Sequence, residues 1–187
     1  MYKLVLVFLF LCFIQGSLKA QAEMELHPKI LEKEIKRLNG DTNRISELAA
    51  SSLATSQLVS GRFYTITTPL EASPVKYAYV GRVKTCRSGG CSVVTEYHDK
   101  ESEYFDYFIL YDSACSIRLV KIYNYQATHG QEVTAKSWLK QFIGYHGEAE
   151  LLAGKNVDAI SGATISVHAI NYDIEYRTGL LKQAIKQ

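Results

Sequence analysis

The sequence has no excess of charge of either sign, since its 21 lysines and arginines nearly balance its 19 aspartates and glutamates. The basic residues are scattered rather than gathered into a stripe, which argues against nucleic acid as a partner. Internal repeats, low-complexity tracts and long linkers are also missing. A chain of 187 residues, 47% of them hydrophobic, is long enough for one compact domain and too short for two ordinary ones.

Cysteine is scarce, with four in the whole sequence, one of which lies in an N-terminal apolar run. Cys86 and Cys91 enclose a short segment with two glycines, which permits the tight return of a disulfide loop in an oxidising compartment. We favour this pairing, with two free thiols as the alternative. Because no suitably spaced histidine pair lies nearby, the two cysteines do not predict a zinc site. Cys115 has no assigned partner.

The N-terminal apolar run is too short to cross a membrane. It extends from Leu4 to Ile14, about half of the ~20 residues that a bilayer-spanning helix needs. Lys3 precedes the run, and a small-x-small pattern that ends at Ala22 follows it, as in a secretory signal peptide. We expect export to the periplasm or another extracytoplasmic compartment with cleavage after Ala22, and an uncleaved anchor is the alternative.

Groups for self-contained catalysis are also absent. The sequence has no Ser/His/Asp or Cys/His arrangement that would activate a nucleophile, and no paired carboxylates at helical spacing. We therefore expect no catalytic residues in this chain.

The hydrophobic pattern changes along the chain, with helical spacing at both ends and alternation in the middle. It predicts an α+β fold in which an antiparallel meander is flanked by N-terminal helices and two C-terminal helices. The expected divisions are a signal peptide over 1–22, an N-terminal helical segment over 23–60 and one domain over 61–187. The expected elements are two helices within 23–56, strands over 62–67, 75–84, 91–97, 104–111 and 117–125, and helices over 133–143 and 165–185.

Two of the expected helices are defined by their apolar residues. In the N-terminal segment, Asn39 and Gly40 end a first helix, and Ile45, Leu48 and Leu53 mark the inner face of a second. The helix over 133–143 is expected to bury Trp138, Leu139, Phe142 and Ile143.

A segment of small residues precedes the last predicted helix. Asp158 is followed by Ser161, Gly162, Ala163 and Thr164, and these small side chains allow a phosphate to approach the backbone. Gly162 adds conformational freedom for a turn, and the N–H groups at the start of the helix favour an anion. This pattern predicts anion binding without naming the anion, and the alternative for Thr164 is a simple helix cap.

The same segment resembles the flavinylation motif of FMN-binding domains, as found in the C subunit of the sodium-pumping NADH:quinone reductase and the G subunit of the Rnf complex. The resemblance implies that residues 61–187 form an FMN-binding domain. It also implies that Thr164 is bonded to the phosphate of FMN by a flavin transferase, which uses FAD and Mg²⁺ and releases AMP. Asp158, Ser161, Gly162 and Ala163 would then be recognition and phosphate-loop positions.

A second segment, which includes Thr128, His129 and Gly130, resembles the family's Glu-Thr-Pro-Gly stretch beside the flavin. Ala127 replaces the Glu and His129 replaces the Pro. The resemblance implies flavin contacts here, and the alternative is an ordinary loop before a helix. Of the neighbouring residues, His168 is either near the phosphate or a surface histidine, and Trp138 and Phe142 are expected in the core.

These expectations combine into one function: an exported flavoprotein that carries covalent FMN and transfers electrons. The expected partners are the flavin transferase, a membrane-bound electron donor and an extracytoplasmic acceptor, with loose membrane association at most. A stand-alone extracytoplasmic flavin reductase and a flavin-free secreted binding module are the alternatives.

Overall fold

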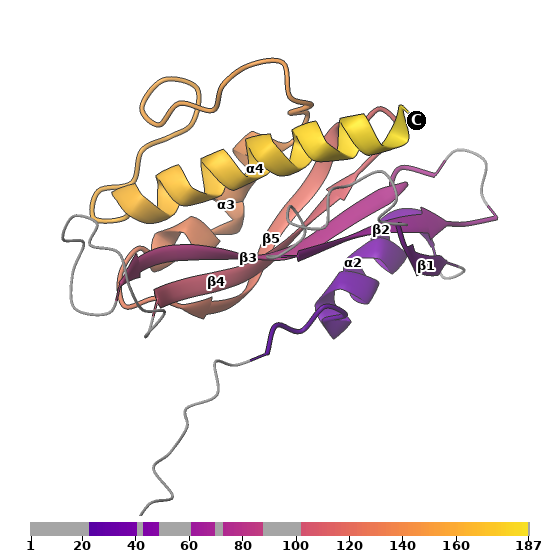
Figure 1. The fold of residues 1–187 in the computed structure, drawn as a ribbon, viewed down its shortest axis with the longest axis horizontal. Helices are drawn as coiled ribbons and strands as arrows, with labels where there is room; N and C mark the ends of the chain where they lie inside the picture. The colour runs from indigo at the N-terminus through magenta and orange to yellow at the C-terminus, as the bar shows by residue number, and fades with distance from the viewer. Residues whose placement is uncertain (1–22, 41–42, 49–60, 70–72, 88–101, 187) are drawn as a thin grey trace, which may run out of the picture.

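The computed structural model describes residues 23–40, 43–48, 61–69, 73–87 and 102–186. Within these ranges the chain forms one layered α+β unit, as predicted (Figure 1). The elements in chain order are α2 (Lys29–Asn39), β1 (Arg44–Glu47), β2 (Gly61–Thr67), β3 (Tyr77–Arg87), β4 (Ser102–Tyr111), β5 (Ile117–Gln126), the 3₁₀ helix η3 (Gln131–Thr134), α3 (Lys136–Leu139), the 3₁₀ helix η4 (Lys140–Phe142) and α4 (Thr164–Ile185).

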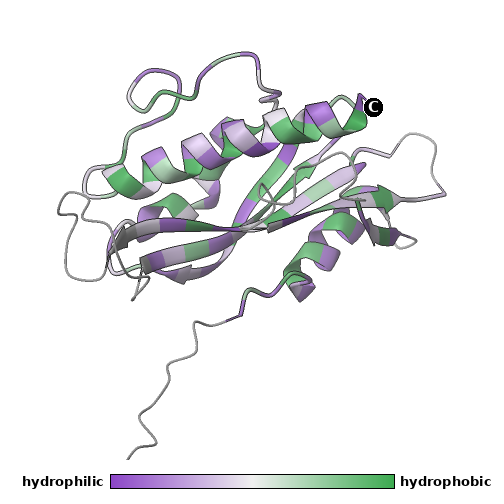
Figure 2. Cartoon of the chain, viewed as in Figure 1, coloured by the Kyte–Doolittle hydropathy of each residue, from purple (hydrophilic) through white to green (hydrophobic). Residues whose placement is uncertain are grey.

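The five described strands form one antiparallel sheet in the order β1-β2-β3-β4-β5. Each strand therefore pairs with its neighbours in the sequence, which confirms the predicted meander. Hydrophobic and hydrophilic residues are mixed along the strands (Figure 2), and successive side chains of a strand point to opposite faces of the sheet.

Helices cover both faces of this sheet: α4 lies along one face and α2 packs on the other (Figure 1). Two hydrophobic clusters result. The cluster on the α4 side is larger and includes Tyr79, Phe105, Tyr107 and Ile109 from the sheet with Val167, Ile170, Ile174 and Leu181 from α4. The cluster on the α2 side includes Tyr64, Ile66, Ala78, Val80, Phe108 and Leu110 with Leu31 and Ile35 from α2.

A buried polar group joins α4 to the sheet. Asp173 accepts a hydrogen bond of 2.6 Å from the Tyr107 hydroxyl, and its other oxygen lies 3.0 Å from Nε of Arg177. Burial raises the pKa of Asp173 despite the opposing charge of Arg177 and the bond from Tyr107. Because the Asp173–Arg177 pair lies within α4, the hydrogen bond from Tyr107 of β4 to Asp173 is the contact of this group that helps to hold α4 on the sheet.

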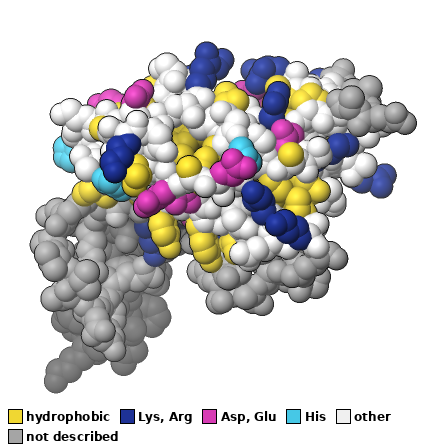
Figure 3. All heavy atoms as spheres, turned by 90° about the horizontal axis from the view of Figure 1, so that it is seen from above, with side chains coloured by type: hydrophobic (Ala, Val, Ile, Leu, Met, Phe, Trp, Pro, Cys, Tyr) yellow, Lys and Arg dark blue, Asp and Glu magenta, His cyan; other side chains and the backbone are white. Residues whose placement is uncertain are grey.

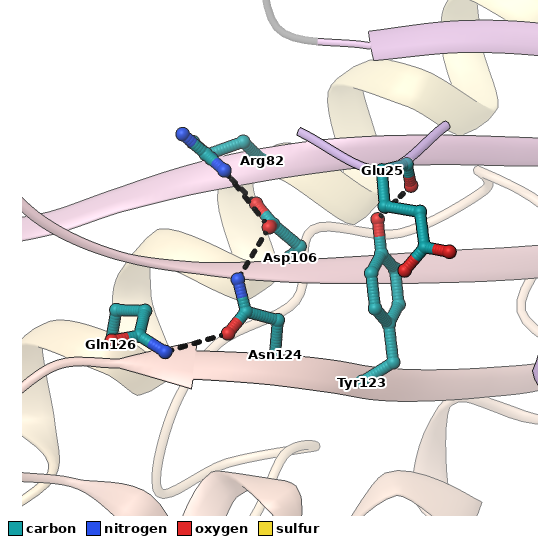
Figure 4. Close-up of polar contacts among 6 residues, drawn as sticks. All are labelled: Glu25, Arg82, Asp106, Tyr123, Asn124 and Gln126. Atoms are coloured by element: carbon teal, nitrogen blue, oxygen red, sulfur yellow. Dashed lines mark hydrogen bonds and ion pairs between the residues drawn. The ribbon is translucent and has the colours of Figure 1, made fainter. Parts of the chain in front are cut away.

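A second polar network lies on the α2 side of the sheet (Figure 4). Asp106, only 1% exposed, accepts two hydrogen bonds from Arg82, at 2.6 and 3.0 Å, and one of 2.8 Å from Asn124. Beside it, the Tyr123 hydroxyl donates to the backbone oxygen of Glu25, at 2.7 Å. The segment before α2 is therefore attached to the sheet next to this network.

The second N-terminal helix predicted from Ile45, Leu48 and Leu53 is wrong over residues 44–47, which form β1. Ile45 is paired with Ile66 of β2 and packs on the α2-side cluster. The spacing of Ile45 and Leu48 fits one face of a helix, but in the extended chain Ile45 packs on the α2-side cluster and Leu48 on the α4-side cluster. Pairing with β2 decides the outcome because it satisfies the backbone groups at the edge of that strand.

The helix predicted over 133–143 is interrupted. Ala135 is extended, with ψ 125°, between η3 and α3, and η4 follows α3 directly. Trp138, Leu139 and Phe142 are buried as expected, but Ile143 is 46% exposed because it leaves the helical path after η4.

Some predictions fall outside the described residues: the signal peptide over 1–22, the strand over 91–97, Leu53 of the second N-terminal helix, and Cys91 with its proposed disulfide to Cys86. Cys115 lies within them and is buried with a free thiol.

Candidate functional site

The small-residue segment forms a tight turn that leads directly into α4. The N–H of Ala163 donates to the carbonyl of Ile160 at 3.1 Å, and Gly162 lies within this turn at φ 80°. Glycine suits this position because a left-handed backbone strains residues with a side chain. Ala163 is 2% exposed and belongs to the α4-side cluster, so the turn is anchored at its last residue.

Thr164 is the first residue of α4 and is exposed to solvent. Ala163 occupies the N-cap position, and no side chain there makes a cap hydrogen bond. The alternative of Thr164 as the helix cap is therefore wrong. The first N–H groups of the 22-residue helix carry the positive end of its dipole, and no acidic residue lies in the first turn to neutralise it.

The segment at residues 128–130 lies against this helix start. Gly130 has φ 84°, and a Cβ at this position would lie 2.8 Å from Oγ of Ser166 and 3.3 Å from Cβ of Ala163. Tyr125 connects the two segments, because its hydroxyl donates to the carbonyl of His129 at 2.5 Å and lies 3.3 Å from Oγ of Ser166. The two segments that the sequence singled out separately are thus neighbours in space.

The remaining side chains around this junction are mostly exposed. Thr128 donates its hydroxyl to the carboxylate of Glu103 at the start of β4. His129 is exposed and contributes its backbone carbonyl to Tyr125. His168 is exposed one turn after Thr164, so both side chains lie on the solvent side of α4.

Asp158, at the start of the motif, is held by its backbone. Its carbonyl accepts a hydrogen bond of 2.9 Å from the indole N–H of Trp138. Its N–H donates to the side-chain oxygen of Gln141 at 2.7 Å. The side chain of Trp138 also packs edge-on against Phe142, with ring centroids 5.2 Å apart. Sequence reasoning placed Trp138 in the core and missed Gln141, although their i, i+3 spacing puts them on one side of a helical segment.

The loop before the motif is attached to α4 in a similar way. The N–H of Leu151 donates to the carboxylate of Glu175, and its carbonyl accepts a hydrogen bond of 3.0 Å from Asn171. Asn156 then bridges the loop internally, from the carbonyl of Glu150 to the N–H of Leu152. The loop over 145–163 is therefore ordered by side-chain contacts, although no hydrophobic period predicted it.

The face of the molecule on the α4 side carries charges of both signs. Seen from the α4 side, acidic, basic and hydrophobic side chains are interspersed (Figure 3). Burial raises the pKa of Tyr125, partly offset by its hydrogen bond with Ser166, so its hydroxyl stays protonated at neutral pH. Among the described residues no three His, Cys, Asp or Glu side chains are grouped to hold a metal ion.

The space around the turn suits a bulky phosphate ester. A Cβ placed on Gly162 would meet no atom within 4 Å, and the Thr164 hydroxyl faces solvent at the positive end of a helix. The residues present therefore fit an anion carried on the oxygen of Thr164.

Comparison with protein families gives a match for residues 103–176, which correspond to a family described as FMN-binding domain. The matched range contains both the 128–130 segment and the turn before α4. Searches of the curated proteins and of the solved structures give no match.

Proposed function

Since the chain belongs to the FMN-binding domain family through residues 103–176, and is therefore a flavin-binding protein, we propose that it carries FMN as a phosphoester on Thr164. The observation that supports this most is the exposed Thr164 hydroxyl at an uncapped helix start, next to open space at Gly162. A threonine hydroxyl is a weak nucleophile, so its activation falls to the flavin transferase and its Mg²⁺.

The rest of the site has a supporting role in this proposal. The helix dipole and the free N–H groups of the first turn stabilise the negative phosphate. The segment 128–130, fixed against Ser166 through Gly130 and Tyr125, borders the same helix start. Bound FMN supplies one- and two-electron redox chemistry, and the protein sets its surroundings.

We further propose that the protein is exported and acts as an electron carrier between a membrane-bound donor and an extracytoplasmic acceptor. The N-terminal signal pattern motivates the location, and a covalent bond prevents loss of the cofactor where free FMN is scarce. None of the helices in the described ranges is long and apolar enough to cross a bilayer.

A stand-alone reductase with the same FMN is the main rival. It requires a substrate site beside the flavin, and steady-state turnover with soluble acceptors separates it from a carrier. The family match favours the electron carrier and the reductase, which both bind FMN, over the flavin-free binding module.

The test is co-expression of the whole chain with a flavin transferase, followed by flavin fluorescence of the denatured band. The wild type and Thr164→Ala are compared with Thr134→Ala, which removes a hydroxyl from η3 instead. We expect fluorescence in the wild type and in Thr134→Ala, and none in Thr164→Ala. A dark wild-type band, or a bright Thr164→Ala band, contradicts the proposal.

A further inference from the structure

We propose that Gln141 is a positioning residue for flavin transfer, which acts by holding the backbone of Asp158 so that the following turn presents Thr164 to the transferase. This inference rests on the proposed attachment of FMN to Thr164. It concerns a residue 23 positions before the attachment point, on a different element of the fold.

The contacts at Asp158 form a two-sided clamp. Gln141 accepts the Asp158 N–H at 2.7 Å, and Trp138 donates to the Asp158 carbonyl at 2.9 Å. Both side chains come from the short α3–η4 segment, which Phe142 anchors in the core at 0% exposure. The Asp158 side chain itself remains exposed. The clamp therefore fixes the backbone and leaves the carboxylate free for recognition by another protein.

Only the oxygen of the Gln141 side-chain amide makes a hydrogen bond with a described residue. Its oxygen holds Asp158, whereas its Nε2 is buried without a hydrogen-bond partner within the described part of the chain. A buried donor without a partner costs free energy, so such a group calls for an explanation. An apolar side chain of similar size would avoid this cost but would leave the Asp158 N–H without its acceptor. The acceptor oxygen is thus the reason to have glutamine at this position.

The position of Asp158 bears on Thr164 because the connection between them is short and constrained. The turn closed by the hydrogen bond from Ala163 to Ile160 begins two residues after Asp158. Ala163 is itself part of the hydrophobic core. The turn is therefore held at one end by Ala163 and at the other by the two hydrogen bonds to Asp158. Loss of the clamp frees the Asp158 end, and a displacement of about 1 Å at a reacting group lowers rates strongly.

The step that the clamp assists is a phosphoryl transfer. The oxygen of Thr164 forms a bond to the phosphorus on the FMN side of FAD, and the bond from that phosphorus to the oxygen shared with AMP breaks. AMP leaves, and the hydroxyl proton passes to a base of the transferase or to water. No electron is gained or lost in this step.

The experiment measures the initial rate of flavin transfer to the full folded chain with purified transferase, FAD and Mg²⁺, well below the melting temperature. Gln141→Leu removes the acceptor, and Gln141→Glu keeps an acceptor oxygen. Trp138→Phe removes the other half of the clamp while it keeps an aromatic ring in the core. Gln131→Leu, at an exposed position in η3, is the matched control.

We expect Gln141→Leu and Trp138→Phe to slow transfer on the order of 10-fold, and Gln141→Glu and Gln131→Leu to stay near the wild-type rate. Rescue by glutamate separates positioning from a general loss of stability, which thermal unfolding of each variant reports independently. If Gln141→Leu does not fold, the rate of flavin transfer to Trp138→Phe tests the inference instead.

Two results overturn the inference while the attachment proposal stands: wild-type rates in both clamp variants, or equal slowing in Gln141→Leu and Gln141→Glu. A wild-type chain that accepts no flavin contradicts the attachment itself, so the two failures are distinguishable.

Discussion

Substitution of Gly130 by alanine tests whether the 128–130 segment is fixed against the start of α4. Gly130 is buried at φ 84°, and an added Cβ would lie 2.8 Å from Oγ of Ser166, 3.1 Å from the hydroxyl of Tyr125 and 3.3 Å from Cβ of Ala163. Gly162 supplies a matched control, since it has nearly the same φ of 80° but no atom within 4 Å of its Cβ position.

The expected magnitudes follow from these two environments. A left-handed backbone costs a residue with a side chain about 1–2 kcal/mol, and this cost applies to Gly130→Ala and Gly162→Ala alike. Overpacking adds about 1–3 kcal/mol at Gly130 only. We therefore expect roughly 2–5 kcal/mol of destabilisation for Gly130→Ala and about 1–2 kcal/mol for Gly162→Ala.

The assay is urea unfolding of the flavin-free protein, with the free energy of unfolding compared among the wild type and the two variants. Adding Ser166→Ala to Gly130→Ala removes the nearest atom and is expected to recover part of the difference. Equal destabilisation at the two glycines would refute the packing of the 128–130 segment against α4.

Two further predictions concern the sheet and α2. Gly81→Ala places a Cβ 2.1 Å from the hydroxyl of the fully buried Tyr79, so we expect a loss of about 3 kcal/mol in urea unfolding, and a loss below ~1 kcal/mol would contradict this packing. For Glu34, burial raises the pKa, but the hydrogen bonds and charges of Lys121 and Arg37 outweigh burial and leave the pKa lowered. Its contribution to stability is therefore present above the unfolded carboxyl pKa of about 4.3 and is lost as the pH falls below that value through the folded pKa. Urea unfolding from pH 6 down to about pH 3 should show a steeper loss for the wild type than for Glu34→Gln, and parallel curves would contradict the pairing.

The sequence predicted the regular elements well where a period was long and unbroken. The helical spacing over 165–185 predicted α4, whose apolar residues Val167, Ile170, Ile174 and Leu181 are buried. Alternation predicted the strands of the meander, although helices cover both faces of the sheet and β4 is buried continuously from Phe105 to Tyr111. The pattern over residues 44–47 failed because a run so short fits a helix or a strand, and pairing with β2 decides.

The resemblance implied that both halves of the candidate site contact one flavin, but the sequence did not show the direct contact of Gly130 with the start of α4. The turn around Gly162 and the segment at Gly130 were found as separate local patterns. Their contact depends on how α4 lies on the sheet, which the hydrogen bond between Tyr107 and Asp173 helps to fix. Gln141 was missed because the sequence does not distinguish a polar residue that faces water from one that accepts a hydrogen bond from a distant backbone N–H. The N–H that Gln141 accepts belongs to Asp158, 17 residues away.

The central claim is a covalent bond between the Thr164 oxygen and the phosphate of FMN. The most direct test is mass spectrometry of the peptide that contains Thr164, taken from the mature protein isolated from its own host. We expect a peptide heavier by one FMN phosphoester, with the modification assigned to Thr164. An unmodified peptide, or a flavin found on another residue, contradicts it.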